Sequence, residues 1–205
     1  GKVHRMLDKA VAFGVFGTRL RSLIKMPSAT GIKAVVDQQF SLAKACIAQG
    51  MVPILQPEVD SKSPDKAACE RILRLTLFDA LRDLDPDDKI ILELTLPEET
   101  NAYHHLTLHP NVLRVAVTPC GDNRSMTYER VGQNPRTVPS IGRHLTKNLN
   151  VEYTEHKFTQ ALEEGIMLAW DAINEGVNTS EQTVDTARGA EVKEEACNDA
   201  EVARA

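Results

Sequence analysis

The sequence predicts an α/β protein organised around a parallel β-sheet. Five runs of apolar and β-branched residues alternate with stretches in which apolar residues recur at helical spacing, and this alternation is typical of repeated βα units. The 205 residues carry 42% apolar side chains and a net charge of -5, a composition typical of a globular domain with a sizeable core.

Each expected strand is a short apolar run flanked by helical stretches. The runs cover residues 14–21, 52–59, 90–96, 112–117 and 137–141, of which the last is the weakest. Five strands are too few for a closed parallel barrel, which needs eight, whereas a doubly wound sheet can stop at five. The pattern alone therefore leaves both architectures open.

The helical stretches have ordinary end signals and apolar stripes. Gly50 is placed to end one helix, and Ser63 before Pro64 is typical of an N-cap and first turn of the next. Thr154 is expected to cap a last helix that ends at Gly176. The residues expected to face the core are Ile32, Val35, Val36, Phe40, Ala43 and Ile47, then Ala68, Ile72, Leu75 and Phe78, and finally Phe158, Leu162, Ile166, Ala169 and Ile173.

The composition of the sequence limits which classes of partner and which cellular compartment we expect for this protein. The sequence has no run of roughly 18 apolar residues and no secretory signal pattern, so neither a membrane anchor nor secretion is predicted. Cys46, Cys69, Cys120 and Cys197 form no CxxC pair, which favours reduced thiols. The acidic balance argues against nucleic acid as a partner, because Lys and Arg are not clustered. We expect a cytoplasmic protein, with a plastid or another organelle left open.

Seven motifs, taken in order, carry a resemblance to a known family. They lie at 16–22 (FGTRLRS), 38–40 (QQF), 50–59 (GMVPILQPEV), 92–97 (LELTLP), 101–103 (NAY), 109–110 (HP) and 140–143 (SIGR). In this order they resemble segments of bacterial-type class I fructose-bisphosphate aldolases, over roughly residues 3–176. The resemblance implies an incomplete (β/α)8 TIM barrel, with strands four to eight, over residues 1–177. Residues 178–205 are expected to form an acidic, disordered tail.

The start of the chain suggests that the sequence is partial. Residues 3–12 already have helical character, and Gly1 is not an initiator methionine. We therefore expect a processed or partial sequence, in which the first three strands of the implied barrel would lie upstream.

The resemblance also implies a reaction, which the residues present do not support. Members of the family cleave fructose 1,6-bisphosphate to two triose phosphates, in glycolysis and gluconeogenesis, through a Schiff base on a strand lysine. Glu93 stands at that position, and a carboxylate cannot form the iminium ion that accepts electrons from the broken carbon–carbon bond. Lys89 lies on the same face but roughly 13 Å away, towards the wrong end of the strand. We expect a catalytically impaired or inactive chain.

The neighbouring positions implied by the resemblance have changed as well. Gln56 stands at the position of an acid/base glutamate and cannot titrate, while Glu58, the next carboxylate, is retained. Arg19 stands at the position of an active-site lysine and keeps only its charge. The implied phosphate-binding residues are Arg21, Gly121 and Arg143. The family's Ser-Gly-Gly phosphate loop reads Pro119-Cys120-Gly121 here, which removes a hydroxyl donor.

Glu93 itself is expected to form a structural ion pair. The apolar residues on either side place its side chain inside the barrel, where an unpaired charge is unfavourable. Its expected partners are Arg19, Arg21 and Arg143.

Three histidines, His104, His105 and His109, raise the alternative of a metal site. No adjacent carboxylate or fourth ligand accompanies them, so surface histidines are favoured. We expect no metal ion and no cofactor.

Three functions remain open at this stage. The chain is expected to be a non-catalytic homologue that binds a phosphorylated sugar weakly, or a protein partner; the alternatives are an active aldolase known only as a fragment or divergent copy, and a structural or assembly subunit. Five strands of an eight-stranded barrel leave two sheet edges open. We therefore also expect a homo-oligomer, or association with the missing barrel strands.

Overall fold

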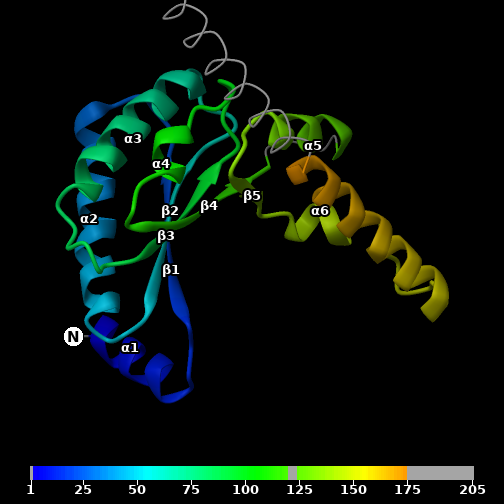
Figure 1. Ribbon diagram of the computed structural model, residues 1–205, viewed down its shortest axis with the longest axis horizontal. Coiled ribbons are helices and arrows are strands. Elements are labelled where there is room, and N and C mark those ends of the chain that lie inside the picture. The colour runs from blue at the N-terminus through cyan, green and yellow to red at the C-terminus, as the bar shows by residue number, and fades with distance from the viewer. Residues whose placement is uncertain (1, 120–123, 175–205) are drawn as a thin grey trace, which may run out of the picture.

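Five parallel strands form the centre of the protein in a computed structural model that describes residues 2–119 and 124–174 (Figure 1). The strands are β1 (Gly17–Ile24), β2 (Val52–Val59), β3 (Ile90–Thr95), β4 (Val112–Thr118) and β5 (Thr137–Pro139). They lie side by side in chain order, and every neighbouring pair is parallel. All five expected strands are confirmed. β1 begins three residues later than expected, because residues 13–14 form a turn and residues 15–16 are the irregular link that leads into the strand.

Helices alternate with the strands, as the βα repeat predicts. They are α1 (Lys2–Ala12), α2 (Ala29–Ile47), α3 (Lys66–Leu81), α4 (His104–Thr107), α5 (Arg124–Gly132) and α6 (Gly142–Thr146), with a further helix over 155–174. A doubly wound sheet reverses its strand order at a switch point, whereas these strands follow the chain without reversal. This is the arrangement of part of a TIM barrel. Within the described ranges, no helix combines the length and apolar character needed to cross a membrane.

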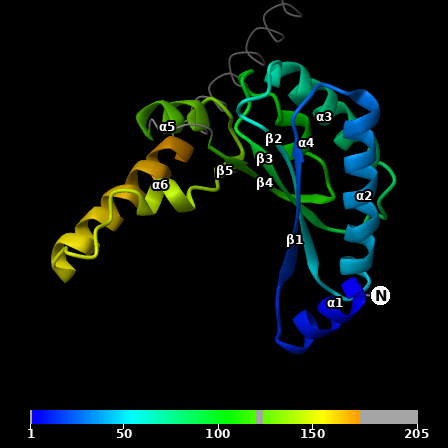
Figure 2. The same cartoon turned by 180° about the vertical axis from the view of Figure 1, so that it is seen from behind.

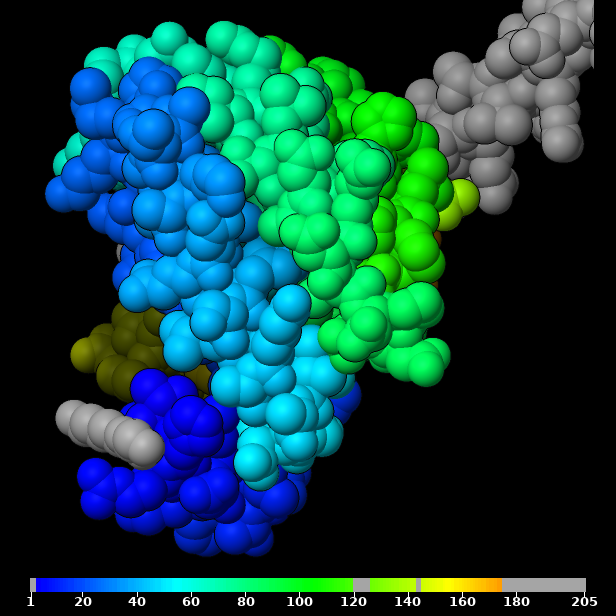
Figure 3. All heavy atoms as spheres, turned by 90° about the vertical axis from the view of Figure 1, so that its left-hand side faces the viewer, coloured from blue at the N-terminus to red at the C-terminus, as the bar shows by residue number. Residues whose placement is uncertain are grey.

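The core lies between the sheet and the helices that cover one of its faces. Figures 1 and 2 show α2, α3 and α4 on the same side of the sheet, and Figure 3 shows α2 and α3 packed beside each other as the outer layer. The apolar stripe expected on α2 is confirmed, because Ile32, Val36, Phe40 and Ala43 are all buried. Burying each large side chain contributes about 1.5–3 kcal/mol to folding.

The start predicted for α3 is wrong, and of its predicted buried stripe only Ile72 packs against the core. The N-cap is Asp65, which accepts a hydrogen bond from the Ala68 N–H at 2.9 Å, and not Ser63. Leu75 and Phe78, expected in the core, are 63% and 39% exposed. The buried residues of α3 are Lys66, Cys69, Glu70, Leu73, Leu77 and Leu81. Two charged residues lie within this buried stripe, so it resembles a solvated face in the sequence, and the prediction fell on the opposite side of the helix.

The last helix was predicted in part. Thr154 caps it as expected, because the Lys157 N–H donates to Thr154 Oγ1 at 3.4 Å. Ala169 joins the core with Ala172, while Phe158 and Ile166 of the expected stripe are 40% and 49% exposed. This helix lies beside α5 (Figure 2), where a side-chain carbon at Gly132 would come within 3.2 Å of the Ala172 carbonyl oxygen. The expected helix end at Gly176 and the expected disorder of 178–205 fall outside the described residues.

Gly17 is required by the close approach of β1 to β2. A Cβ atom at this position would lie 2.1 Å from the carbonyl oxygen of Val52, and backbone cannot move away as a flexible side chain can. We expect Gly17→Ala to lower the free energy of unfolding by about 1–3 kcal/mol, measured by urea denaturation. Gly142→Ala is the matched control, because nothing lies within 4 Å of its Cβ position. Equal stability of the two variants would contradict the prediction.

Candidate functional site

Glu93 lies on the face of the sheet that points away from α2 and α3, called the inner face below. Side chains alternate along a strand, so Leu92 and Leu94 enter the core under the helices while Glu93 points to the other side. Despite its charge, Glu93 is only 4% exposed. A carboxylate buried to this degree needs partners.

Four donors from four other segments surround the Glu93 carboxylate. Arg19 Nε of β1 lies 3.1 Å from Oε2. Oε1 accepts hydrogen bonds from Ser140 Oγ at 3.0 Å, from Thr118 Oγ1 at 3.3 Å and from Gln56 Nε2 at 3.4 Å. The expected ion pair is therefore present, with Arg19 as the arginine. Both carboxylate oxygens are occupied.

Arg21 pairs with a different carboxylate. Its Nε and Nη2 atoms both lie 2.7 Å from Glu58 Oε2, so it does not act as the partner of Glu93. The hydrogen bond to Glu58, together with Coulomb attraction, raises the pKa of Arg21 above its ordinary value. Because arginine is already protonated at neutral pH, this shift leaves its charge unchanged. The inner face thus holds two ion pairs, each with an arginine from β1.

The site lies where two strands separate. The ladder between β2 and β3 ends at Leu55 opposite Leu92, one residue before Glu93. Beyond that point the Thr95 hydroxyl links the strands, because it donates to the Val59 carbonyl and accepts from the Val59 N–H, both at 2.9 Å. The carboxyl ends of the strands are where active sites lie in parallel barrels.

Gln56 contributes both a donor and an unsatisfied acceptor. It is 5% exposed, and its Nε2 is directed at Glu93. Its Oε1 is buried and has no hydrogen-bond partner among the described residues. An unmet buried acceptor costs about 1–3 kcal/mol, so Gln56 is not placed here to maximise stability.

Sequence reasoning missed two of the four donors to Glu93. Ser140 lies in the 140–143 motif and Thr118 at the end of β4, but neither was assigned a role. Period-two counting from Ala116, which is paired with Glu93, would have placed Thr118 on the inner face. Ser140 gives no comparable signal, because it follows a strand of only three residues.

Of the remaining predicted positions, Gly121 and Arg143 have no described side-chain contacts, whereas those of Lys89 are described. Gly121 lies within 120–123, outside the described residues, and Arg143 is placed in α6 without a described side chain. Their phosphate contacts stay predictions. Lys89 donates to the carbonyl oxygens of Pro86 and Pro110 at 2.8 and 3.2 Å, at the N-terminal end of β3. None of the strands β1 to β5 contains a lysine.

The three histidines do not converge. The rings of His104 and His105 meet edge-on at 5.8 Å, and His109 packs edge-on against Phe78 at 5.9 Å. Burial lowers the pKa of His109. Across residues 2–119 and 124–174, no group of three or more His, Cys, Asp or Glu residues is arranged to hold a metal ion.

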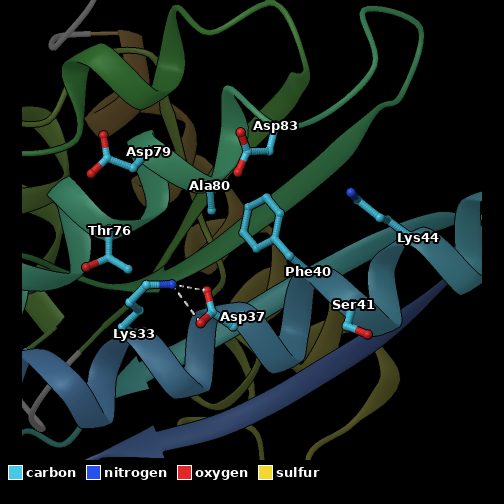
Figure 4. Close-up of a pocket in the computed structure, with 9 residues that line it drawn as sticks. All are labelled: Lys33, Asp37, Phe40, Ser41, Lys44, Thr76, Asp79, Ala80 and Asp83. Atoms are coloured by element: carbon cyan, nitrogen blue, oxygen red, sulfur yellow. Dashed lines mark hydrogen bonds and ion pairs between the residues drawn. The ribbon is translucent and has the colours of Figure 1, made fainter.

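A hollow of about 620 Å³ lies on the other side of the sheet, between α2 and α3 (Figure 4). Phe40 lies between the two helices, and Lys33 on α2 holds Asp37 at 2.7 and 2.8 Å. Asp79 of α3 and Asp83, two residues beyond the end of α3, also line it. Mixed charges of this kind are typical of solvated helix faces. The hollow is separated from Glu93 by the sheet and its core.

Comparison with known proteins places the chain among aldolases. No family model matches it. It is 39% identical over 170 residues to the class 1 fructose-bisphosphate aldolase of Clostridium acetobutylicum, covering 83% of this chain and 58% of that protein. It is 40% identical over 171 residues to the class 1 fructose-bisphosphate aldolase of a Synechocystis species, covering 83% of this chain and 57% of that protein. The chain thus spans less than three fifths of the length of these relatives. By sequence and by strand order, it belongs to the class 1 fructose-bisphosphate aldolase family.

Proposed function

We propose that this chain is a class 1 fructose-bisphosphate aldolase homologue that has lost Schiff-base chemistry and binds a phosphorylated sugar without cleaving it. The proposal depends on one observation, the burial and hydrogen bonding of the Glu93 carboxylate. At the position where the resemblance implies an amine, a buried carboxylate is held by Arg19 and by three further donors.

Cleavage of a ketose between C3 and C4 needs an electron sink at C2. An amine provides it by attacking the carbonyl and losing water, which leaves a protonated imine that accepts the electron pair of the broken bond. The oxygens of Glu93 cannot form this imine. Gln56 cannot move the protons that the addition and dehydration steps require, because an amide does not titrate. Two successive requirements of the reaction are therefore missing.

The inner face still has arginine side chains that can bind an anionic ligand. The side chains of Arg19 and Arg21 are 57% and 60% exposed, so part of each guanidinium can donate to a phosphate. Each arginine is also paired with a carboxylate, Glu93 or Glu58, and this neutralisation weakens its attraction for an anion. Weak binding without turnover is the expected combination.

Borohydride trapping tests the proposal directly. We expect no substrate-derived adduct on any lysine when the 205-residue chain is reduced in the presence of fructose 1,6-bisphosphate and its peptides are analysed by mass spectrometry. Titration calorimetry should show binding with a dissociation constant of roughly 1 mM, about -4 kcal/mol. The Clostridium acetobutylicum relative serves as the positive control for trapping. An adduct on any lysine of this chain would refute the proposal.

A further inference from the structure

The loop that follows β3 is held by charged side chains from two helices. Lys66 Nζ of α3 donates to the Leu96 carbonyl at 2.9 Å, and Arg130 Nη2 of α5 donates to the Pro97 carbonyl at 2.5 Å. The Glu98 N–H donates to Glu70 Oε2 of α3 at 3.0 Å. Main-chain groups of three consecutive residues, 96–98, are each bound by a charged side chain.

Two of these side chains form a buried ion pair. Lys66 is 6% exposed and Glu70 is 3% exposed, and Lys66 Nζ also contacts Glu70 Oε1. Burial raises the pKa of Glu70, and this effect outweighs its hydrogen bonds to Glu98 and Lys66. Buried ion pairs add little net stability compared with apolar residues of similar volume. The pair is therefore better explained by the loop geometry it sets than by the stability it adds.

The loop matters for the site because the end of β3 is paired along one edge only: its ladder with β4 continues to Thr95, and the Leu96 N–H donates to the Thr118 carbonyl at 2.8 Å. On the other edge, backbone pairing with β2 stops at Leu92, and past that point β3 is joined to β2 by side chains, the Thr95 hydroxyl to Val59 and Gln56 to Glu93. The Thr95 carbonyl accepts a further hydrogen bond from Tyr103 at 3.1 Å. Glu93 lies within this stretch, only three residues before Leu96. A shift of residues 96–98 would be passed to the Glu93 carboxylate through a short piece of strand.

We propose that Lys66, Glu70 and Arg130 are positioning residues, which hold residues 96–98 so that the end of β3 keeps Glu93 within reach of Arg19 and Ser140. Arg130 also joins the loop after β3 to α5, the helix that follows β4. The loop geometry can be tested without a ligand; only its effect on sugar binding rests on the proposed function.

Arg130 offers the cleanest test, because it is half-buried and lies outside the apolar core. Hydrogen exchange of the amides of residues 93–100 should speed up about tenfold in Arg130→Ala, the change expected for losing one charge-assisted hydrogen bond. Arg130→Lys should restore most of the protection, since an ammonium can still donate to Pro97. The matched control is Arg74→Ala, which removes an arginine bond to a carbonyl, that of Ala102, beyond this segment.

The same variants are then titrated with fructose 1,6-bisphosphate, and Arg130→Ala is expected to bind it several-fold more tightly than the wild type, because an Arg19 less firmly paired with Glu93 has more of its charge free for a phosphate. Unchanged exchange at residues 93–100 in Arg130→Ala would overturn the inference. Faster exchange with unchanged affinity would also overturn it, since the loop would then not act on the site. If the wild type binds no fructose 1,6-bisphosphate, the proposed function fails, and exchange at residues 93–95 alone decides the positioning role.

Discussion

Lys66→Met is expected to lower the free energy of unfolding by about 3–5 kcal/mol, more than any surface substitution in this chain. The substitution removes the only charge that compensates Glu70 among its described contacts and leaves the Leu96 carbonyl without its donor. Glu70 would stay buried as an unpaired carboxylate. Urea denaturation at neutral pH measures the effect.

A double-mutant cycle separates the interaction energy of the Lys66–Glu70 ion pair from the packing energy of the two side chains. Lys66→Met and Glu70→Leu together should cost far less than the sum of the single changes, because two apolar side chains of similar volume need no charged partner. The remaining cost, about 1–3 kcal/mol, comes from the loop groups at Leu96 and Glu98 that lose their partners. Additive single effects would show that the two charges are not coupled.

The pH dependence of Lys66→Met has a definite sign. The pKa of Glu70 is already raised in the folded protein, so folding favours its protonated form. Stability linked to this group is therefore greatest below the unfolded pKa and is lost as the pH rises through the folded pKa. Without Lys66 the folded pKa rises further. The variant should be closer to the wild type in stability at acidic pH than at neutral pH, and a gap that widens on acidification would contradict the assignment.

The same two residues explain why part of the fold could not be read from the sequence. Alternation of strands and helices predicts the parallel sheet, and the chain order of the strands could be expected once the family motifs were noticed. The buried face of α3 could not be predicted from apolar spacing, because Lys66 and Glu70 occupy it and bind a loop that follows the next strand. Charged core positions of this kind depend on tertiary contacts, which hydrophobic periodicity does not encode.

The candidate site was predictable to a similar extent. The resemblance places Glu93, Gln56 and Arg19 together, and the structure brings them into contact. Which arginine pairs with which carboxylate could not be derived, since Arg19 and Arg21 both project from the inner face of β1 and the choice depends on how far each reaches across the sheet. Ser140 was missed because its position depends on where a three-residue strand ends.

Restoring an amine to the inner face should restore imine formation. In the double variant Glu93→Lys and Gln56→Glu, we expect borohydride to trap a substrate-derived adduct at position 93 in the presence of fructose 1,6-bisphosphate. The guanidinium of Arg19, now 3.1 Å from the Glu93 carboxylate, would lie near the new amine and lower its pKa. In Glu93→Lys alone, more of the amine would then be in its reactive, unprotonated form; in the double variant the carboxylate introduced at position 56 raises the amine's pKa, and its benefit is proton transfer.

The change at Gln56 should decide how fast that adduct forms. Its side chain already lies within 3.4 Å of the position 93 side chain, so a carboxyl group there can transfer protons during addition and dehydration. We expect Glu93→Lys alone to be labelled roughly a hundredfold more slowly than the double variant, in line with the usual contribution of general acid–base catalysis. Glu93→Gln, which keeps the shape of the side chain without an amine, is the matched control and should remain unlabelled. If the double variant is as stable as Glu93→Gln and still forms no adduct, the inner face lacks the geometry for an imine, and the loss of chemistry in this chain extends beyond the residue at position 93.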